Sequence, residues 1–183
     1  MSHAAMYRLS AVFYALLALA GGGWILWRDG LAGLTPAPWP RLALGALEGT
    51  AGGLAVVLVW AYLARVTSYL REFEESLAAH FRGMALAGTA WLALASAVGE
   101  ELLFRGGVQG SFGLWLASAA FALVHVPLRR EIALWPVFAF SVGLLLGWIY
   151  DRNGSLAAPI AGHFTVNFIN LTRMARGTHG GAP

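Results

Sequence analysis

The stretch LSAVFYALLALAGGGWILW, from Leu9 to Trp27, decides the fold of this protein, because it contains nineteen consecutive residues without a charge. A helix needs about 20 apolar residues to cross the hydrocarbon core of a membrane, with a range of about 17–25. The stretch is too long for the apolar core of a signal peptide, and no small-residue cleavage site follows it. We therefore expect a transmembrane helix here.

The composition of the whole chain agrees with this expectation. Of the 183 residues, 58% are hydrophobic and 11% are charged, whereas soluble domains are about 45–50% apolar and about 25% charged. This excludes a water-soluble enzyme or nucleic-acid-binding module. The net charge of +3 does not indicate nucleic-acid binding, because the arginines lie between apolar runs and form no patch. The absence of cysteine excludes disulfides, thiolate catalysis and cysteine-ligated metals.

Five more apolar runs follow the first, at residues 42–64, 84–111, 114–126, 134–150 and 155–172. Between the second and third runs, Val66 to Arg82 has apolar residues at helical spacing, which indicates an amphipathic helix in the membrane interface. Its other face is expected to carry the charges Arg71, Glu72, Glu74, Glu75 and Arg82. Lipid tolerates only helices or closed barrels, and no alternating strand pattern occurs. The sequence therefore predicts an all-α, polytopic membrane bundle of about six transmembrane helices plus one interfacial amphipathic helix.

We predict a single domain with three parts. Residues 1–83 supply two transmembrane helices and the interfacial helix, residues 84–172 form a four-helix core, and residues 173–183 form a flexible tail. In this topology one side of the membrane holds Arg8, Arg65, Arg71, Arg82, Arg129, Arg130, Arg173 and Arg176, and the other holds Arg28, Arg41 and Arg152. The positive-inside rule then places both termini in the cytoplasm. We expect an integral protein of the bacterial inner membrane.

Ionisable side chains at membrane depth are costly, so each is a candidate functional residue. This chain has a cluster of them in its C-terminal half, together with an asparagine. They are Glu100, Glu101 and Arg105 in the third run, His125 at the end of the fourth, and His163 and Asn167 in the sixth. Glu101 and Arg105 are four residues apart and would neutralise each other.

Spacing predicts that four of these side chains lie at a common depth. Glu100 lies 12 residues before a turn expected at Phe112, and His125 lies 13 residues after it. Both would then be about 18–20 Å from the apex of an antiparallel hairpin. His163 and Asn167 are four residues apart and share one helix face. We expect the four side chains to converge on one buried point.

These residue types suit hydrolysis. A carboxylate in a low-dielectric site is a better general base than one in water, so Glu100 could take a proton from water. His125 could hold or polarise that water. His163 and Asn167 are suitable hydrogen-bond donors to the oxyanion of a tetrahedral intermediate.

Three motifs resemble those of the CAAX-protease and bacteriocin-processing (CPBP) family, the relatives of type II CAAX prenyl endopeptidase. Residues 100–105 (EELLFR) are similar to its EExxxR motif, residues 121–125 (FALVH) to FxxxH, and residues 163–167 (HFTVN) to HxxxN. The resemblance covers residues 84–172 and implies an intramembrane glutamic endopeptidase whose catalytic core is this segment.

The resemblance also implies a role for the motif residues. Glu100 and His125 are implied as the water-activating pair, and His163 and Asn167 as the oxyanion site. The second glutamate and the arginine of the first motif would support them. The implied substrate is a membrane-associated protein or peptide, cut near its C-terminus as by bacterial sorting or processing peptidases. We expect no cofactor and no nucleic-acid partner.

Two alternatives stay open. The family was once taken for metalloproteases, so the first is a zinc-dependent enzyme that uses Glu100, His125 and His163 as ligands. The second is a protein without protease activity, either a small transporter or a bacteriocin self-immunity protein, since buried Glu and His are also typical of transporters. The repeated spans that transporters often show are not found. Only two spans precede the motifs and the soluble portion is very small, which argues against eukaryote-like CAAX processing.

Overall fold

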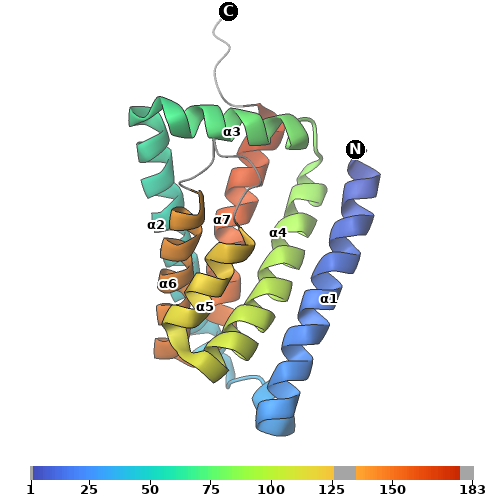
Figure 1. Ribbon diagram of the computed structural model, residues 1–183, viewed down its shortest axis with the longest axis vertical. Helices are drawn as coiled ribbons and strands as arrows, with labels where there is room; N and C mark the ends of the chain where they lie inside the picture. Colours follow the sequence, from blue (N-terminus) through green and yellow to red (C-terminus); the bar gives the residue numbers. More distant parts are fainter. Residues whose placement is uncertain (1, 126–134, 178–183) are drawn as a thin grey trace, which may run out of the picture.

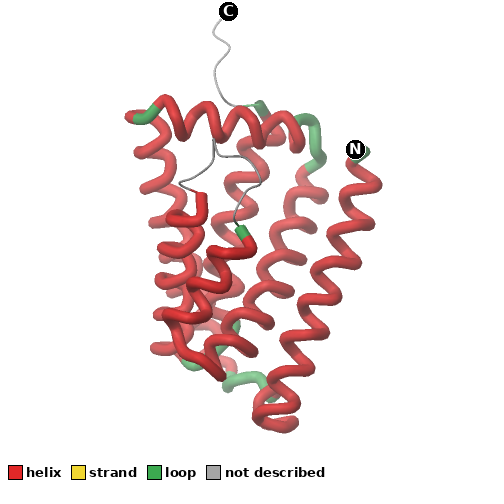
Figure 2. Tube along the Cα trace, viewed as in Figure 1, coloured by secondary structure: helices red, strands yellow, loops and turns green. Residues whose placement is uncertain are grey.

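The computed structural model describes residues 2–125 and 135–177. Over these ranges the chain is helical and contains no strand (Figure 2). The predicted all-α membrane bundle is therefore confirmed. The elements are α1 (His3–Asp29), η1 (Gly30–Leu34), α2 (Trp39–Val66), α3 (Ser68–Phe81), α4 (Leu86–Glu101), η2 (Leu102–Gln109), α5 (Gly110–Val124), α6 (Trp135–Asn153) and α7 (Ala157–Arg176).

The long helices run side by side, and α3 lies across one end of them (Figure 1). Helix α7 is the central helix, because it packs against α2 and α4 and also contacts α3 and α6. Helix α1 lies at the edge of the bundle, against α4 and η2.

Three helical segments in the described part of the chain are long and apolar enough to cross a membrane. They are His3–Leu34, Trp39–Val66 and Leu86–Val124. The third contains both α4 and α5, which run in opposite directions (Figure 1). Helices α6 and α7 do not meet the same criterion. In α7 polar residues such as His163 and Asn167 lower the hydropathy, so length and apolarity alone give fewer spans than the six expected from the sequence.

A turn at Gly113 reverses the chain between α4 and α5. The φ angle of Gly113 is +82°, a left-handed conformation inside a stretch that is otherwise helical. Glycine adopts this conformation without a steric penalty, whereas other residues do not. The turn expected at Phe112-Gly113 is thus confirmed, and it makes α4 with η2 one arm of an antiparallel hairpin and α5 the other.

The α2–α7 interface depends on two glycines of α2. A Cβ atom at Gly49 would overlap the backbone carbonyl oxygen of Ala158, and one at Gly53 would lie 2.5 Å from the carbonyl oxygen of Gly162. Small residues at such positions let helix backbones approach closely in membrane bundles. The position of α7, which carries two of the candidate site residues, therefore depends on α2.

Helix α3 confirms the expected amphipathic element with one correction. Its apolar residues Leu70 and Phe73 are buried against the bundle. Glu74, which we expected on the polar face, is also buried, with 3% of its surface exposed. It lies four residues after Leu70 and so falls on the same helix face. Burial is tolerated because the indole N–H of Trp60 donates a hydrogen bond of 2.6 Å to Glu74 Oε1.

The start of α1, the whole of α3 and the end of α7 lie at the same end of the molecule (Figure 1). Arg8, Arg71, Arg173 and Arg176 belong to these segments, Arg65 lies at the end of α2 next to α3, and Arg82 directly follows α3. Arg129 and Arg130, also assigned to the cytoplasmic side, lie outside the described residues. These arginines thus lie at one end of the bundle, and the side of the membrane that this end faces stays a prediction.

Candidate active site

The two adjacent glutamates are the last residues of α4, and the helix changes character directly after them. Element η2 is a π-helix, whose hydrogen bonds run from residue i to residue i+5. Helix α1 supports it from outside: Arg28 Nη1 donates to the carbonyl oxygens of Gly106 and Gly107 at 2.9 and 3.1 Å. Short π-helical segments occur often at functional sites.

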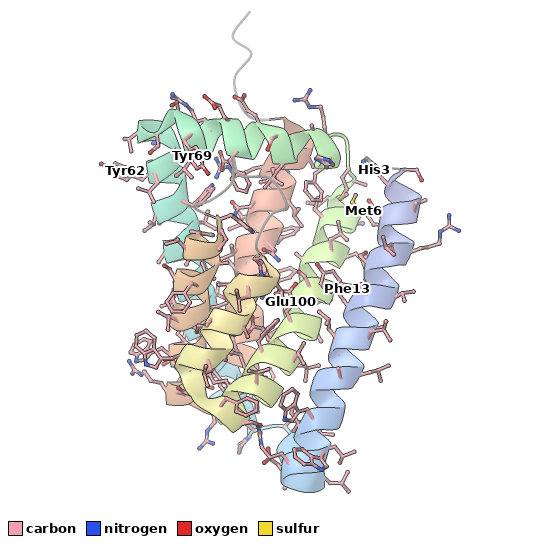
Figure 3. All side chains as sticks on the ribbon, in the orientation of Figure 1. His3, Met6, Phe13, Tyr62, Tyr69 and Glu100 are labelled. Atoms are coloured by element: carbon pink, nitrogen blue, oxygen red, sulfur yellow. The ribbon has the colours of Figure 1, made fainter. Side chains whose placement is uncertain are left out.

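Glu100 is the meeting point of three helices. Its Oε2 atom lies 3.8 Å from His125 Nε2 at the end of α5 and 4.0 Å from His163 Nε2 in α7. The residue is 7% exposed and lies in the interior of the bundle, well away from α3 (Figure 3). The structure thus brings together three of the side chains that spacing placed at a common depth.

His125 is oriented by its own helix. Its Nδ1 lies 2.7 Å from the carbonyl oxygen of Phe121. Because a carbonyl only accepts hydrogen bonds, Nδ1 carries the hydrogen, and a neutral His125 ring presents the lone pair of Nε2 toward Glu100. The Phe121 ring lies against the His125 ring, with 4.4 Å between the ring centroids, and this contact limits rotation of the imidazole.

Glu101 faces a different set of partners from Glu100. It is fully buried, and its Oε2 lies 3.1 Å from Nε of the fully buried Arg105. The expected pair of Glu101 and Arg105 is therefore present. The other carboxylate oxygen of Glu101, Oε1, accepts a hydrogen bond of 2.7 Å from His163 Nδ1. We did not expect this second contact, which makes Glu101 the link between the arginine and the histidine.

Asn167 lies one turn after His163 on α7. Its Nδ2 donates to Ser96 Oγ at 2.9 Å, and Ser96 lies one turn before Glu100 on α4. Among the described residues no hydrogen bond joins Asn167 directly to Glu100 or to a histidine. Ser96 was not predicted as a site residue, although its position four residues before Glu100 places it on the same face of α4.

A cavity of about 370 Å³ lies between α3 and the candidate site. Asn167 and Ser96 are part of its wall, and most of the other lining residues are apolar or aromatic, including Trp60, Phe73 and Trp135. An apolar cavity with a few polar groups at one side is typical of a site that binds an organic ligand. A second cavity of about 390 Å³ opens at the opposite end of the bundle, and none of the predicted site residues lines it.

The zinc alternative requires three ligands in coordinating positions. Glu100, His125 and His163 supply suitable donor atoms, but in the described ranges no group of three His, Cys, Asp or Glu side chains is arranged to hold a metal ion.

Comparisons with known proteins identify the segment that contains this site. The sequence model of the family described as "Type II CAAX prenyl endopeptidase Rce1-like" matches residues 82–169. This range contains all three motifs and begins after α3. The resemblance inferred from the motifs is confirmed. Together with the apolar helices, the match identifies an integral membrane protein.

A curated protein of Bacillus subtilis (strain 168), "Uncharacterized protein YpbD", is 37% identical over 81 residues. The aligned region covers 43% of this chain and 41% of that protein, so the chain spans less than half the length of this relative. No solved structure matches.

Proposed function

We propose that this chain, which carries an Rce1-like segment at residues 82–169, is an intramembrane glutamic endopeptidase. It hydrolyses a peptide bond near the C-terminus of a membrane-associated protein or peptide, in the manner of a bacterial sorting or processing peptidase. One observation supports this most strongly. A buried carboxylate, Glu100, faces two imidazoles at 3.8 and 4.0 Å without a direct hydrogen bond to either.

The space between Glu100 and His125 suits the attacking water. A separation of 3.8 Å is too long for a direct hydrogen bond, and polar atoms at such distances are often bridged by water. A water there donates one hydrogen to the Nε2 lone pair of His125 and the other to Glu100. As its oxygen bonds to the substrate carbonyl carbon, Glu100 takes the second proton. When the C–N bond breaks, Glu100 returns that proton to the leaving amine.

The oxyanion of the tetrahedral intermediate needs hydrogen-bond donors on the side away from Glu100 and the attacking water. Asn167 supplies an amide N–H. His163 supplies Nε2–H when its ring is doubly protonated, because its Nδ1–H is already donated to Glu101. In that state two carboxylates, Glu100 and Glu101, are balanced by Arg105 and the imidazolium. A neutral buried cluster avoids the cost of an uncompensated charge, which is the supporting role that we propose for Glu101 and Arg105.

The substrate chemistry follows from the surroundings of the site. The cavity next to Asn167 is lined mainly by apolar and aromatic side chains, which suits an apolar peptide segment drawn from the membrane. We propose that the protein works without a metal or other cofactor in the bacterial inner membrane, with both termini in the cytoplasm.

The test compares the C-termini of membrane proteins between cells that have the gene and cells that lack it. Processed C-termini should be present with the wild type and absent with Glu100→Gln or His125→Ala. Glu72→Gln, a carboxylate exposed on α3, is the matched control and should process normally. Normal processing by a folded Glu100→Gln protein would refute the proposal, as would identical C-termini with and without the gene, which would favour the transporter or immunity alternative.

A further inference from the structure

The Asn167 amide is held by a residue that lies outside all three motifs. Ser96 is 4% exposed and lies on α4, one turn before Glu100. Its Oγ donates to the carbonyl oxygen of Ala93 at 3.1 Å and accepts from Asn167 Nδ2 at 2.9 Å. Ser96 therefore links the helix of the general base to the helix of the oxyanion donor.

The direction of these hydrogen bonds determines which way the amide faces. A hydroxyl has one hydrogen, and that of Ser96 is used by the Ala93 carbonyl. The two lone pairs of Oγ can then only accept hydrogen bonds, so the NH₂ group of Asn167 faces Ser96 and the amide oxygen does not. Nδ2 has a second hydrogen, and Asn167 makes no other side-chain hydrogen bond within residues 2–125 and 135–177.

We infer that Ser96 is a positioning residue for the proposed peptidase reaction: it fixes the Asn167 amide with its second N–H available to the oxyanion. This inference rests on the proposed function. Without the Ser96 hydroxyl, the amide can rotate by half a turn and present its oxygen, which repels an oxyanion. Asn167 would still be present, but in the wrong orientation for part of the time.

Substitutions at Ser96 and Asn167 test this inference. Cleavage is measured in proteoliposomes with a fluorophore–quencher peptide that contains a C-terminus processed only in cells with the gene. Ser96→Ala should lower kcat by about 10- to 100-fold, because small misplacements of catalytic groups have effects of this size. The KM should change by less than about twofold, because the lost interaction acts only in the transition state. Ser118→Ala is the matched control, since Ser118 is a fully buried serine whose hydroxyl has no hydrogen-bond partner among the residues that the structure describes.

Ser96→Thr and Ser96→Val form an isosteric pair that differs in the hydroxyl group. A helical threonine can bond the carbonyl three or four residues earlier, as Ser96 does with Ala93. Thr should therefore keep most of the activity, and Val should lose it to the same extent as Ala. This pair decides the question even if the Ala variant fails to fold, because both side chains have nearly the same volume.

A double-mutant cycle shows whether Ser96 acts through Asn167. Asn167→Ala alone should lower kcat by about 10²–10³-fold, as the loss of one oxyanion donor does. In that background Ser96→Ala should change kcat by less than about twofold, because coupled sites are not additive. Equal effects in both backgrounds, or wild-type kcat in Ser96→Val, would overturn the inference alone. If Glu100→Gln cleaves this peptide as fast as the wild type does, the proposed function fails as well.

Discussion

At the scale of single residues, the two neighbouring glutamates have different surroundings although they are adjacent in the sequence. Successive residues of a helix point about 100° apart, so Glu100 faces the imidazoles of His125 and His163, and Glu101 faces Arg105 and the other nitrogen of His163. Glu100 Oε2 has no hydrogen-bond partner among the described residues, so it can accept a hydrogen bond from a bound water. Glu101 is fully enclosed and bonded, which suits a residue that holds others in place.

This difference predicts unequal losses of stability for the two Glu→Gln substitutions. Glu101→Gln removes a carboxylate that contacts Arg105 and His163 in the interior, and it leaves the guanidinium without a counter-charge. Breaking a buried pair of this kind lowers the free energy of unfolding by about 3–5 kcal/mol. Chemical denaturation in detergent micelles should show this loss for Glu101→Gln and a much smaller one for Glu100→Gln. A Glu101→Gln protein as stable as the wild type would contradict the proposed structural role.

The proposed metal-free chemistry also belongs to the residue scale. If Glu100 and His125 activate water by proton transfer, strong chelators should leave the rate of peptide cleavage unchanged. The measurement compares purified protein before and after dialysis against EDTA and 1,10-phenanthroline. Loss of activity that zinc restores would support the metalloprotease alternative instead.

At the scale of elements, helices outside the Rce1-like segment hold its site in position. The Arg28 side chain of α1 bonds carbonyl oxygens of η2. A Cβ atom at Gly21 of α1 would lie 2.5 Å from the backbone of Leu102, so the two backbones are in close contact. Helix α2 holds α7 in a similar way. Residues 1–81 therefore position the site although the predicted catalytic residues all lie beyond them.

The glycine contacts predict where a single methyl group disrupts the bundle. Gly49→Ala should push α2 away from α7, because its Cβ would overlap the Ala158 carbonyl oxygen. Overpacking of this kind lowers stability by about 1–3 kcal/mol. Gly22→Ala is the matched control, because a Cβ at that position meets no atom within 4 Å outside its own stretch of helix, as far as the chain is described. Thermal unfolding in detergent should show a lower Tm for Gly49→Ala alone, and equal Tm values would contradict the packing that we describe.

At the scale of the whole molecule, one end of the bundle is covered by α3 and the other carries the connections from α1 to α2 and from α6 to α7 (Figure 1). Arginines assigned to the cytoplasm belong to the α3 end. The apolar cavity also lies between α3 and the site. A substrate that enters from the cytoplasmic leaflet would thus reach Asn167 by way of this cavity.

The topology can be tested in a chain that has no cysteine of its own. Ala79 in α3 and Ala32 in η1 are exposed at opposite ends. A membrane-impermeant maleimide added to the outside of spheroplasts should label Ala32→Cys but not Ala79→Cys, and inverted membrane vesicles should give the reverse. The reversed result in both preparations would place the termini outside the cytoplasm.

The sequence predicted the helical class, the interfacial helix, the hairpin turn and the chemistry-bearing residues because each depends on local spacing. Helical periods and the lengths of uncharged runs are properties of a single segment. The turn could likewise be predicted from the local sequence at Phe112-Gly113. The prediction that Glu74 lies on the exposed face of α3 was wrong. The charge pattern of α3 does not show that Trp60, in another helix, donates a hydrogen bond to this glutamate. Ser96 was missed for a related reason, because its hydrogen bond goes to Asn167 in another helix. The π-helix was also not predicted, because the spacing of apolar residues does not show a change from i+4 to i+5 hydrogen bonds.

The sequence by itself determined that this chain forms a helical bundle in a membrane and that its polar residues lie at similar depths, because run length and residue count set both. Only the tertiary structure decided which faces of α4, α5 and α7 meet. In that structure Glu100 lies next to the two imidazoles, Glu101 contacts Arg105 and His163, and Asn167 donates a hydrogen bond to Ser96. Helix rotation and close glycine packing fix those pairings, and they depend on contacts between segments far apart in the chain.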